Sequence, residues 1–87
     1  MENYVREIAL IGQKNFEKLR AARVAVFGIG GVGSYAAEAL VRAGVGTIDF
    51  VDGNCVAASN LNRQLIALHS TLGKNKAEVM AARALDI

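Results

Sequence analysis

The chain has 87 residues, of which 53% are hydrophobic and 21% are charged, and its formal net charge is +2. This length is enough for one small domain, and the small net charge gives no reason to expect DNA or an anionic membrane as a partner. The N-terminal stretch MENYVREIALIG carries charges where a signal peptide needs an apolar core, and no apolar run is long enough to span a bilayer. The single cysteine, Cys55, cannot form an internal disulfide. We therefore expect a cytoplasmic protein that neither binds DNA nor inserts stably into a membrane.

The first predicted elements are a short helix over residues 15–23 and a buried strand over residues 23–27. In the helix, Phe16 and Leu19 lie three residues apart and share one face. The strand sequence RVAVF is short, apolar and contains β-branched residues, and a glycine follows it.

The glycine-rich sequence GIGGVG spans residues 28–33, between this strand and a predicted helix over residues 32–43. Gly28, Gly30 and Gly33 fit the pattern G-x-G-x-x-G. The first glycine allows a tight turn, the second lets phosphate oxygens approach the backbone, and the third lets helix and strand pack closely. The N-terminus of the helix offers unpaired N–H groups and a partial positive charge to an anion. In this setting the loop indicates nucleotide binding rather than a purely structural turn.

A second strand is predicted over residues 47–51, after a helix end that Gly44 is suited to cap. Glu38 and Arg42 form an i,i+4 pair on the polar face of that helix. Asp52 follows the strand, at the position where a carboxylate meets ribose hydroxyls in dinucleotide folds. NAD binding is therefore one interpretation of the loop and Asp52 together. The alternative is an aspartate that only begins a turn.

The rest of the chain is predicted to form a short helical or irregular segment over residues 59–68 and a last helix over residues 74–85. The expected inner face of that helix consists of Ala77, Met80, Ala81, Ala84 and Leu85. Strand, helix and strand in this order form a right-handed βαβ crossover with two parallel strands. The predicted fold class is α/β, a Rossmann-like doubly wound parallel sheet. Because two strands are too few for a stable parallel sheet, we expect residues 1–87 to be the N-terminal part of a single domain whose remainder is absent.

The segment SNLNRQ, residues 59–64, raises the question of whether the site binds ATP or NAD. It places Arg63 just after the strand end that borders the site, and Lys76 lies near the start of the last helix. A dinucleotide pyrophosphate needs little more than the loop and the helix dipole, whereas a triphosphate about to be cleaved carries more charge, which arginine and lysine stabilise. The alternative is that both residues are solvated surface charges, and their spacing does not decide between the two.

Four motifs in order give the chain a resemblance to a known family. GIGGVG, Asp52, SNLNRQ and Lys76 closely resemble the adenylating domain of the HesA/MoeB/ThiF family, the bacterial relatives of ubiquitin-activating enzymes. Within that family, REIALIG, FGIGGVGSYAAEAL and ALHSTLGKNKAEVM are most similar to the branch of tRNA threonylcarbamoyladenosine dehydratases. The resemblance covers essentially the whole chain and implies that the nucleotide is ATP.

The resemblance also implies a role for individual residues. The ATP-binding residues would be Gly28, Gly30, Gly31, Gly33, Asp52, Asn60, Arg63, Gln64 and Lys76, with Asp52 on the ribose. Arg63 and Lys76 would also act in catalysis by neutralising charge at the α-phosphate. Arg6 would reach into the site of the other subunit, so a homodimer is expected.

The reaction that the resemblance implies is attack of a carboxylate on the α-phosphate of ATP, which gives an acyl-adenylate and pyrophosphate. In the tRNA branch the carboxylate belongs to the threonylcarbamoyl group, and the adenylate closes to a cyclic product with net dehydration. In a second branch the carboxylate is the C-terminal glycine of a small sulfur-carrier protein. Further alternatives are an NAD-binding oxidoreductase domain and a non-catalytic nucleotide-binding or dimerisation module.

Two departures from the family pattern bear on activity. The family's strand end usually reads D-x-D, whereas this chain has Asp52, Gly53 and Asn54. The family's magnesium-binding aspartate would lie beyond position 87, so no metal ligand is expected within the chain, and these residues by themselves are not expected to catalyse adenylation. Cys55 is interpreted as a structural thiol, and His69 is expected to bind no metal.

Overall fold

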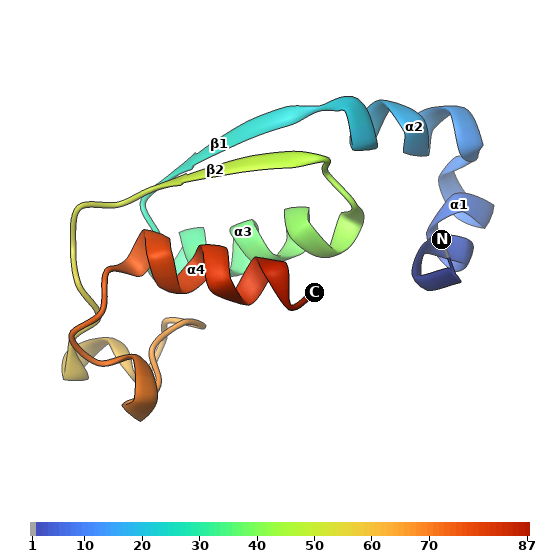
Figure 1. The fold of residues 1–87 in the computed structure, drawn as a ribbon. Helices are drawn as coiled ribbons and strands as arrows, with labels where there is room; N and C mark the ends of the chain where they lie inside the picture. Colours follow the sequence, from blue (N-terminus) through green and yellow to red (C-terminus); the bar gives the residue numbers. More distant parts are fainter. Residues whose placement is uncertain (1) are drawn as a thin grey trace.

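The computed structural model describes residues 2–87, which form a small parallel sheet with helices along the chain before, between and after its strands (Figure 1). Its elements in chain order are η1 (Glu2–Tyr4), α1 (Val5–Ile11), α2 (Gln13–Ala21), β1 (Arg23–Phe27), α3 (Gly31–Ala43), β2 (Thr47–Val51), η2 (Ala58–Asn60), η3 (His69–Thr71) and α4 (Lys76–Leu85). Both strands have the predicted bounds. Within the described residues, no helix is both long enough and apolar enough to cross a membrane.

The sheet is a parallel pair connected by α3. Arg23 lies opposite Thr47 and Phe27 lies opposite Val51, and α3 and α4 pack together on one face of the sheet (Figure 1). The predicted βαβ unit is therefore confirmed. The prediction that β1 is buried is wrong, because its residues alternate between exposed and half-buried and Phe27 is 77% exposed. Within residues 2–87 the opposite face of the sheet has no helix on it.

The main core lies between the two helices and the loops at the carboxyl ends of the strands. Its buried residues are Ile29, Ala37, Val56, Ile66, Ala67 and Met80, with Val26 and Phe50 of the strands packed against them. Two of these residues, Ile66 and Ala67, come from the segment for which a short helical or irregular structure is predicted. The core therefore fixes that segment against the first turns of α3 and α4.

The helix predicted at residues 15–23 occupies residues 13–21, and two earlier elements are not predicted. Phe16 is fully buried and its ring lies 4.9 Å from the Tyr4 ring, centroid to centroid. The new helix α1 lies at the far end of the molecule from the loops that follow the two strands (Figure 1). It has no buried residue and exposes Val5 and Leu10, which explains why it lacks the clear one-sided pattern of a core helix.

The last helix begins two residues later than predicted. Asn75 caps it, with its Oδ1 accepting a hydrogen bond of 3.1 Å from the Glu78 N–H. The chain before this cap is extended: the Val56 N–H donates to the Lys74 carbonyl at 2.8 Å, and the Lys76 N–H donates to the Asn54 carbonyl at 3.0 Å. Residues 73–75 therefore pair with residues 54–56 instead of starting the helix.

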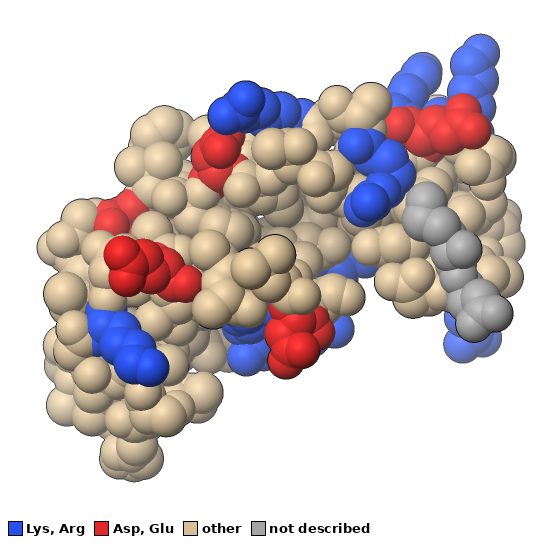
Figure 2. All heavy atoms as spheres, in the orientation of Figure 1, with Lys and Arg blue, Asp and Glu red and all other residues tan. Residues whose placement is uncertain are grey.

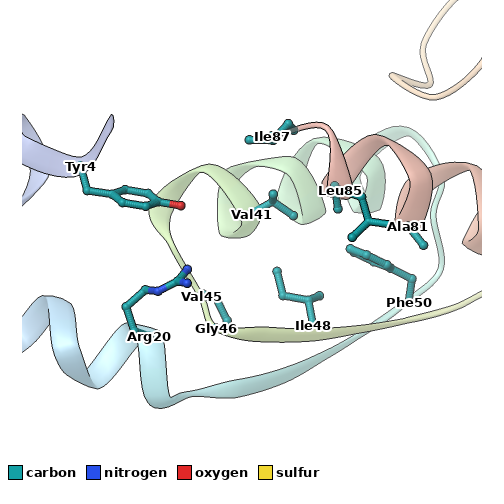
Figure 3. Close-up of a pocket in the computed structure, with 11 residues that line it drawn as sticks. Tyr4, Arg20, Val41, Val45, Gly46, Ile48, Phe50, Ala81, Leu85 and Ile87 are labelled. Carbon is teal, nitrogen blue, oxygen red and sulfur yellow. The ribbon is translucent and has the colours of Figure 1, made fainter. Parts of the chain in front are cut away.

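The far end of α4 faces a hollow rather than a packed core. Met80 is buried as predicted, but Ala81 is exposed and Leu85 is 91% exposed. Both line an open hollow of about 410 Å³ together with Ile48 and Phe50 of β2 (Figure 3). The prediction that these two residues face the core is wrong, because the described part of the sheet offers only two strands for α4 to pack on.

Candidate functional site

The glycine loop has a backbone geometry that requires glycine at two positions. Gly28 has a φ of +88°, a conformation that L side chains rarely adopt, and its N–H donates to the Val51 carbonyl at 2.9 Å. A Cβ at Gly33 would lie 1.8 Å from the Gly28 carbonyl oxygen. The predicted tight turn and the predicted close contact of helix and strand are both present.

The space in front of the loop is open. No atom lies within 4 Å of the position that a Cβ would take at Gly28, and at Gly30 the nearest is Gln64 Nε2 at 3.9 Å. Gly30 is the N-cap residue of α3 and has no side chain to bond the first N–H groups of the helix. These N–H groups and the positive end of the helix dipole are therefore available to an anion.

The Asp52 carboxylate is held at the edge of the glycine loop by two backbone N–H groups. Its Oδ2 accepts a hydrogen bond of 2.7 Å from Ile29, and its Oδ1 accepts one of 2.8 Å from Asn54. The bond from Asn54 and then the bond from Ile29 hold the pKa of Asp52 below its usual value. Burial opposes this shift, and the positive charge of Lys76 adds a smaller lowering effect. The carboxylate is thus kept ionised and keeps free lone pairs for a ligand hydroxyl.

Lys76 is a largely buried lysine whose positive charge acts on this carboxylate. The residue is only 8% exposed, which is unusual for a lysine. Its place follows from the pairing of residues 54–56 with residues 73–75 and from the Asn75 Nδ2 group, which donates to the Asp52 carbonyl at 3.3 Å. The Lys76 side chain is therefore packed against the protein along most of its length, and its role at the phosphates stays a prediction.

The segment SNLNRQ packs onto the glycine loop. The aliphatic stem of Arg63 lies 3.8 Å from the position of a Cβ at Gly31, while its Nη1 donates to the Ser59 carbonyl at 2.9 Å. Gln64 is 7% exposed, and its Oε1 is buried without a hydrogen-bond partner among residues 2–87. A buried amide oxygen without a hydrogen-bond partner is costly, so the Oε1 atom of Gln64 has room for a hydrogen bond from a further donor.

Asn60 holds the segment together rather than lying free. It is buried, its Oδ1 accepts a hydrogen bond of 2.9 Å from the Ala57 N–H, and its carbonyl accepts one of 3.0 Å from the Gln64 N–H. These bonds fix the backbone turn that carries Arg63 and Gln64. The prediction that Arg63 and Lys76 converge on one ligand stays a prediction.

The structure does not bring every predicted residue to this place. Arg6 is exposed on α1, at the opposite end of the molecule from the glycine loop (Figure 1). Cys55 is an exposed free thiol and His69 is exposed in η3. Among residues 2–87 there is no group of three His, Cys, Asp or Glu side chains that could hold a metal ion.

Basic residues occur along a stretch from α2 to the start of β1, among them Lys18, Arg20 and Arg23. Figure 2 shows Lys and Arg side chains interspersed with Asp and Glu on the face in view. At the end of the stretch, Arg23 pairs with Asp49 at 2.9 Å, and this hydrogen bond lowers the pKa of the Asp49 carboxyl. An exposed pair of this kind contributes little to stability and reduces the local positive charge.

Two residues of the site were missed from the sequence. Asn75 links the end of β2 to the start of α4, and an asparagine just before a helical pattern is the signal that indicates an N-cap. Ser34 is fully buried in the first turns of α3, and its Oγ accepts a hydrogen bond of 3.2 Å from the Leu65 N–H. The sequence gives no clear signal for this contact because its partners are 31 positions apart.

Comparisons with known proteins bear on the whole chain. The ThiF family model matches residues 4–87. The chain is 49% identical over 87 residues to the tRNA threonylcarbamoyladenosine dehydratase of Bacillus subtilis, a match that covers 100% of this chain and 34% of that protein. It is 46% identical over 74 residues to the adenylyltransferase and sulfurtransferase uba4 of Neosartorya fischeri, which covers 85% of this chain and 15% of that protein.

A solved structure of a dehydratase has the same fold as this chain. The crystal structure of the E. coli tRNA N6-threonylcarbamoyladenosine dehydratase in complex with ATP superposes with a TM-score of 0.95 at 44% identity, covering 98% of this chain and 35% of that one. The predicted family resemblance and the Rossmann-like α/β fold are confirmed. The chain spans about a third of the length of the dehydratases that it matches.

Proposed function

The chain belongs to the ThiF family, and on this premise we propose that it is the N-terminal part of an adenylating domain that binds ATP and activates a carboxylate. The observation that carries the proposal is the largely buried Lys76, whose charge acts on Asp52 at the edge of an open glycine loop. A dinucleotide site has no need of such a cation, whereas cleavage next to the α-phosphate does. The site therefore favours ATP over NAD.

Each part of the site has a place in this proposal. The nucleotide phosphates lie along the loop and the start of α3, and the ribose hydroxyls bond to the free lone pairs of Asp52. The residues proposed to bind ATP are Gly28, Gly30, Gly31, Gly33, Asp52, Asn60, Arg63, Gln64 and Lys76. Gln64 uses its amide hydrogens toward the phosphates, because its Nε2 is the group nearest to Gly30.

In the proposed reaction a carboxylate oxygen forms a bond to the α-phosphorus, and the bond from that phosphorus to the oxygen that bridges to the β-phosphate breaks. Pyrophosphate leaves and an acyl-adenylate remains. Negative charge increases around the α-phosphate during this step, and Arg63 and Lys76 stabilise it electrostatically. The guanidinium of Arg63 is exposed and bonded only to neighbouring oxygens, so it is free to turn toward the nucleotide.

The proposed acceptor is the threonylcarbamoyl carboxylate of a modified tRNA, whose adenylate closes to a ring and releases AMP. The identity to the dehydratase of B. subtilis along the whole chain favours this acceptor. The shorter match to an adenylyltransferase and sulfurtransferase favours the second candidate, the C-terminal carboxylate of a small sulfur-carrier protein. A tRNA acceptor also implies a cytoplasmic protein.

Magnesium is proposed to accompany ATP, but the described residues do not fit a metal site by themselves. No cluster of three His, Cys, Asp or Glu side chains that could hold a metal ion occurs in residues 2–87, so Asp52 belongs to no such cluster there. We place the magnesium ligand in a part of the domain outside these 87 residues. The exposed apolar residues that line the hollow beside α4 support the idea that further elements complete the domain.

The test is AMP release from ATP by the complete protein, supplied either with tRNA that carries threonylcarbamoyladenosine or with a sulfur-carrier protein that ends in two glycines. AMP with the tRNA only is the expected result. Turnover with the carrier protein only would assign the second candidate, and no turnover with either would refute adenylation as the function.

A homodimer is part of the proposal, with Arg6 of one subunit acting in the site of the other. Its position far from its own glycine loop supports this arrangement. When Arg6→Ala and Arg63→Ala chains are mixed in equal amounts, about half of the dimers are mixed, and one of the two sites in each mixed dimer regains both arginines, so AMP release is expected to return to about a quarter of wild type. Mixed dimers as inactive as the two variants would show that Arg6 acts in its own subunit or not at all.

A further inference from the structure

We propose that Ser34 is a positioning residue of the nucleotide site, which holds the SNLNRQ segment in register with the glycine loop. The inference rests on the proposed function for its effect on ATP. Its structural part, a hydrogen bond between α3 and the segment that carries Arg63, stands independently of that function.

The burial of Ser34 indicates that its hydroxyl has a structural role. The residue is fully buried in the first turns of α3, where alanine would be the better helix former and would bury no polar group. A hydroxyl in such a place is costly unless it is hydrogen-bonded. Among residues 2–87 its Oγ has one hydrogen-bond partner, the Leu65 N–H at 3.2 Å.

This hydrogen bond joins two parts of the site that are distant in the sequence. On one side, the Ser34 N–H donates to the Gly30 carbonyl at 2.9 Å, so the residue is anchored to the glycine loop itself. On the other side, Leu65 directly follows Gln64, whose Nε2 lies 3.9 Å from the position of a Cβ at Gly30. The stem of Arg63 lies just as close to the loop.

The consequence is that the buried Ser34 hydroxyl fixes the distance between the backbone of Arg63 and Gln64 and the glycine loop. Without the acceptor, the Leu65 N–H must find water, and the segment has to move outward to reach it. Arg63 would then lie farther from the phosphates, although its own side chain is unchanged. Ser34 thus acts through Arg63 and is not expected to touch the nucleotide.

The test compares variants of the complete protein by amide hydrogen exchange and by AMP release. Ser34→Ala is expected to speed exchange at Leu65 about tenfold, since the Leu65 N–H loses its hydrogen-bond acceptor, and to lower kcat/KM for ATP by about the same factor. Ser34→Thr keeps the acceptor and is expected to restore both values. Ser70→Ala, an exposed serine in η3 without a side-chain hydrogen bond in the described part of the chain, is the matched control and is expected to change neither.

A double variant separates positioning from a general loss of structure. If Ser34 acts by positioning Arg63 and its neighbour Gln64, Ser34→Ala is expected to lower AMP release less in the Arg63→Ala background than in the wild type. Additive losses, or unchanged exchange at Leu65 in Ser34→Ala, would overturn the proposal. Should Ser34→Ala fail to fold, Ser34→Cys keeps the shape with a weaker acceptor and is expected to give intermediate values, and wild-type values there would equally overturn it. A wild-type protein that releases no AMP refutes the proposed function, while the exchange measurement still decides whether the hydrogen bond exists.

Discussion

Replacement of Asp52 by asparagine tests how far this carboxylate holds the two strand ends together. In the wild-type structure its two oxygens accept separate hydrogen bonds from the backbone N–H groups of Ile29 and Asn54. Asparagine keeps one oxygen and replaces the other by an NH₂ group, which cannot accept a bond. One of the two backbone donors therefore loses its partner in Asp52→Asn.

The magnitude follows from the strength of a single bond to a charged acceptor, about 1.5–3 kcal/mol. Because Asp52 is half-buried and water can reach it, we expect a loss near the lower end, about 1.5 kcal/mol of unfolding free energy at about pH 7. The folded pKa of Asp52 lies below the ordinary value of 3.8 for an aspartate. Its contribution is therefore fully present above that value and is lost as the pH falls through the lower folded pKa.

Equilibrium urea unfolding of the wild type and of Asp52→Asn, across the range from about pH 7 to about pH 2, measures this contribution. The free-energy difference between the two proteins is expected to shrink toward the acid end, where the wild-type carboxyl becomes protonated. Asp86→Asn is the matched control, since Asp86 is exposed at the end of α4 and its side chain bonds to no other described residue. A difference of less than about 0.5 kcal/mol at neutral pH, the range of ordinary surface substitutions, or one that does not depend on pH, would refute this reasoning.

Two further predictions concern the loop and the cations. Gly33→Ala is expected to cost about 3 kcal/mol or more of unfolding free energy, because its Cβ would lie 1.8 Å from a backbone oxygen. The control is Gly53→Ala, where no atom lies within 4 Å of the new Cβ and the change should stay within about 0.5 kcal/mol. Similar losses for the two variants in thermal or urea unfolding would contradict the close contact at Gly33. Arg63→Ala is expected to slow AMP release by an amount that corresponds to a loss of about 2–4 kcal/mol of transition-state stabilisation. The control is Arg42→Ala, which removes an exposed partner of a helix ion pair and should leave the turnover unchanged. Equal activity of the two arginine variants would exclude Arg63 from the chemistry.

Local patterns predicted the parts of the fold whose causes are local. The strands begin and end as expected because short apolar, β-branched runs are bounded by turn residues. Gly44 caps α3 in the left-handed conformation, with φ of +96°, and Glu38 pairs with Arg42. The glycine loop and Asp52 were likewise predictable, since their spacing is fixed by one βαβ unit.

The remaining features depend on contacts between segments that are distant in the sequence. The burial of Lys76 follows from the pairing of residues 54–56 with residues 73–75, which has no periodic pattern to indicate it. The bond from Leu65 to Ser34 is of the same kind. Predictions of burial failed at Phe27 and Leu85, because sequence patterns indicate which side chains favour burial and not whether the surrounding elements are present to cover them.

The pairing of residues 54–56 with residues 73–75 also makes the stretch between them a closed loop with a fixed base. Both backbone bonds of Val56, to Lys74 and from Gly73, are 2.8 Å long. The entropy of closing such a loop grows only slowly with length, by about 0.6 kcal/mol for each doubling. Insertions near η3, at the outer part of the loop, should therefore cost little, while opening of the base would release Lys76 and the SNLNRQ segment together as one cooperative unit of local unfolding.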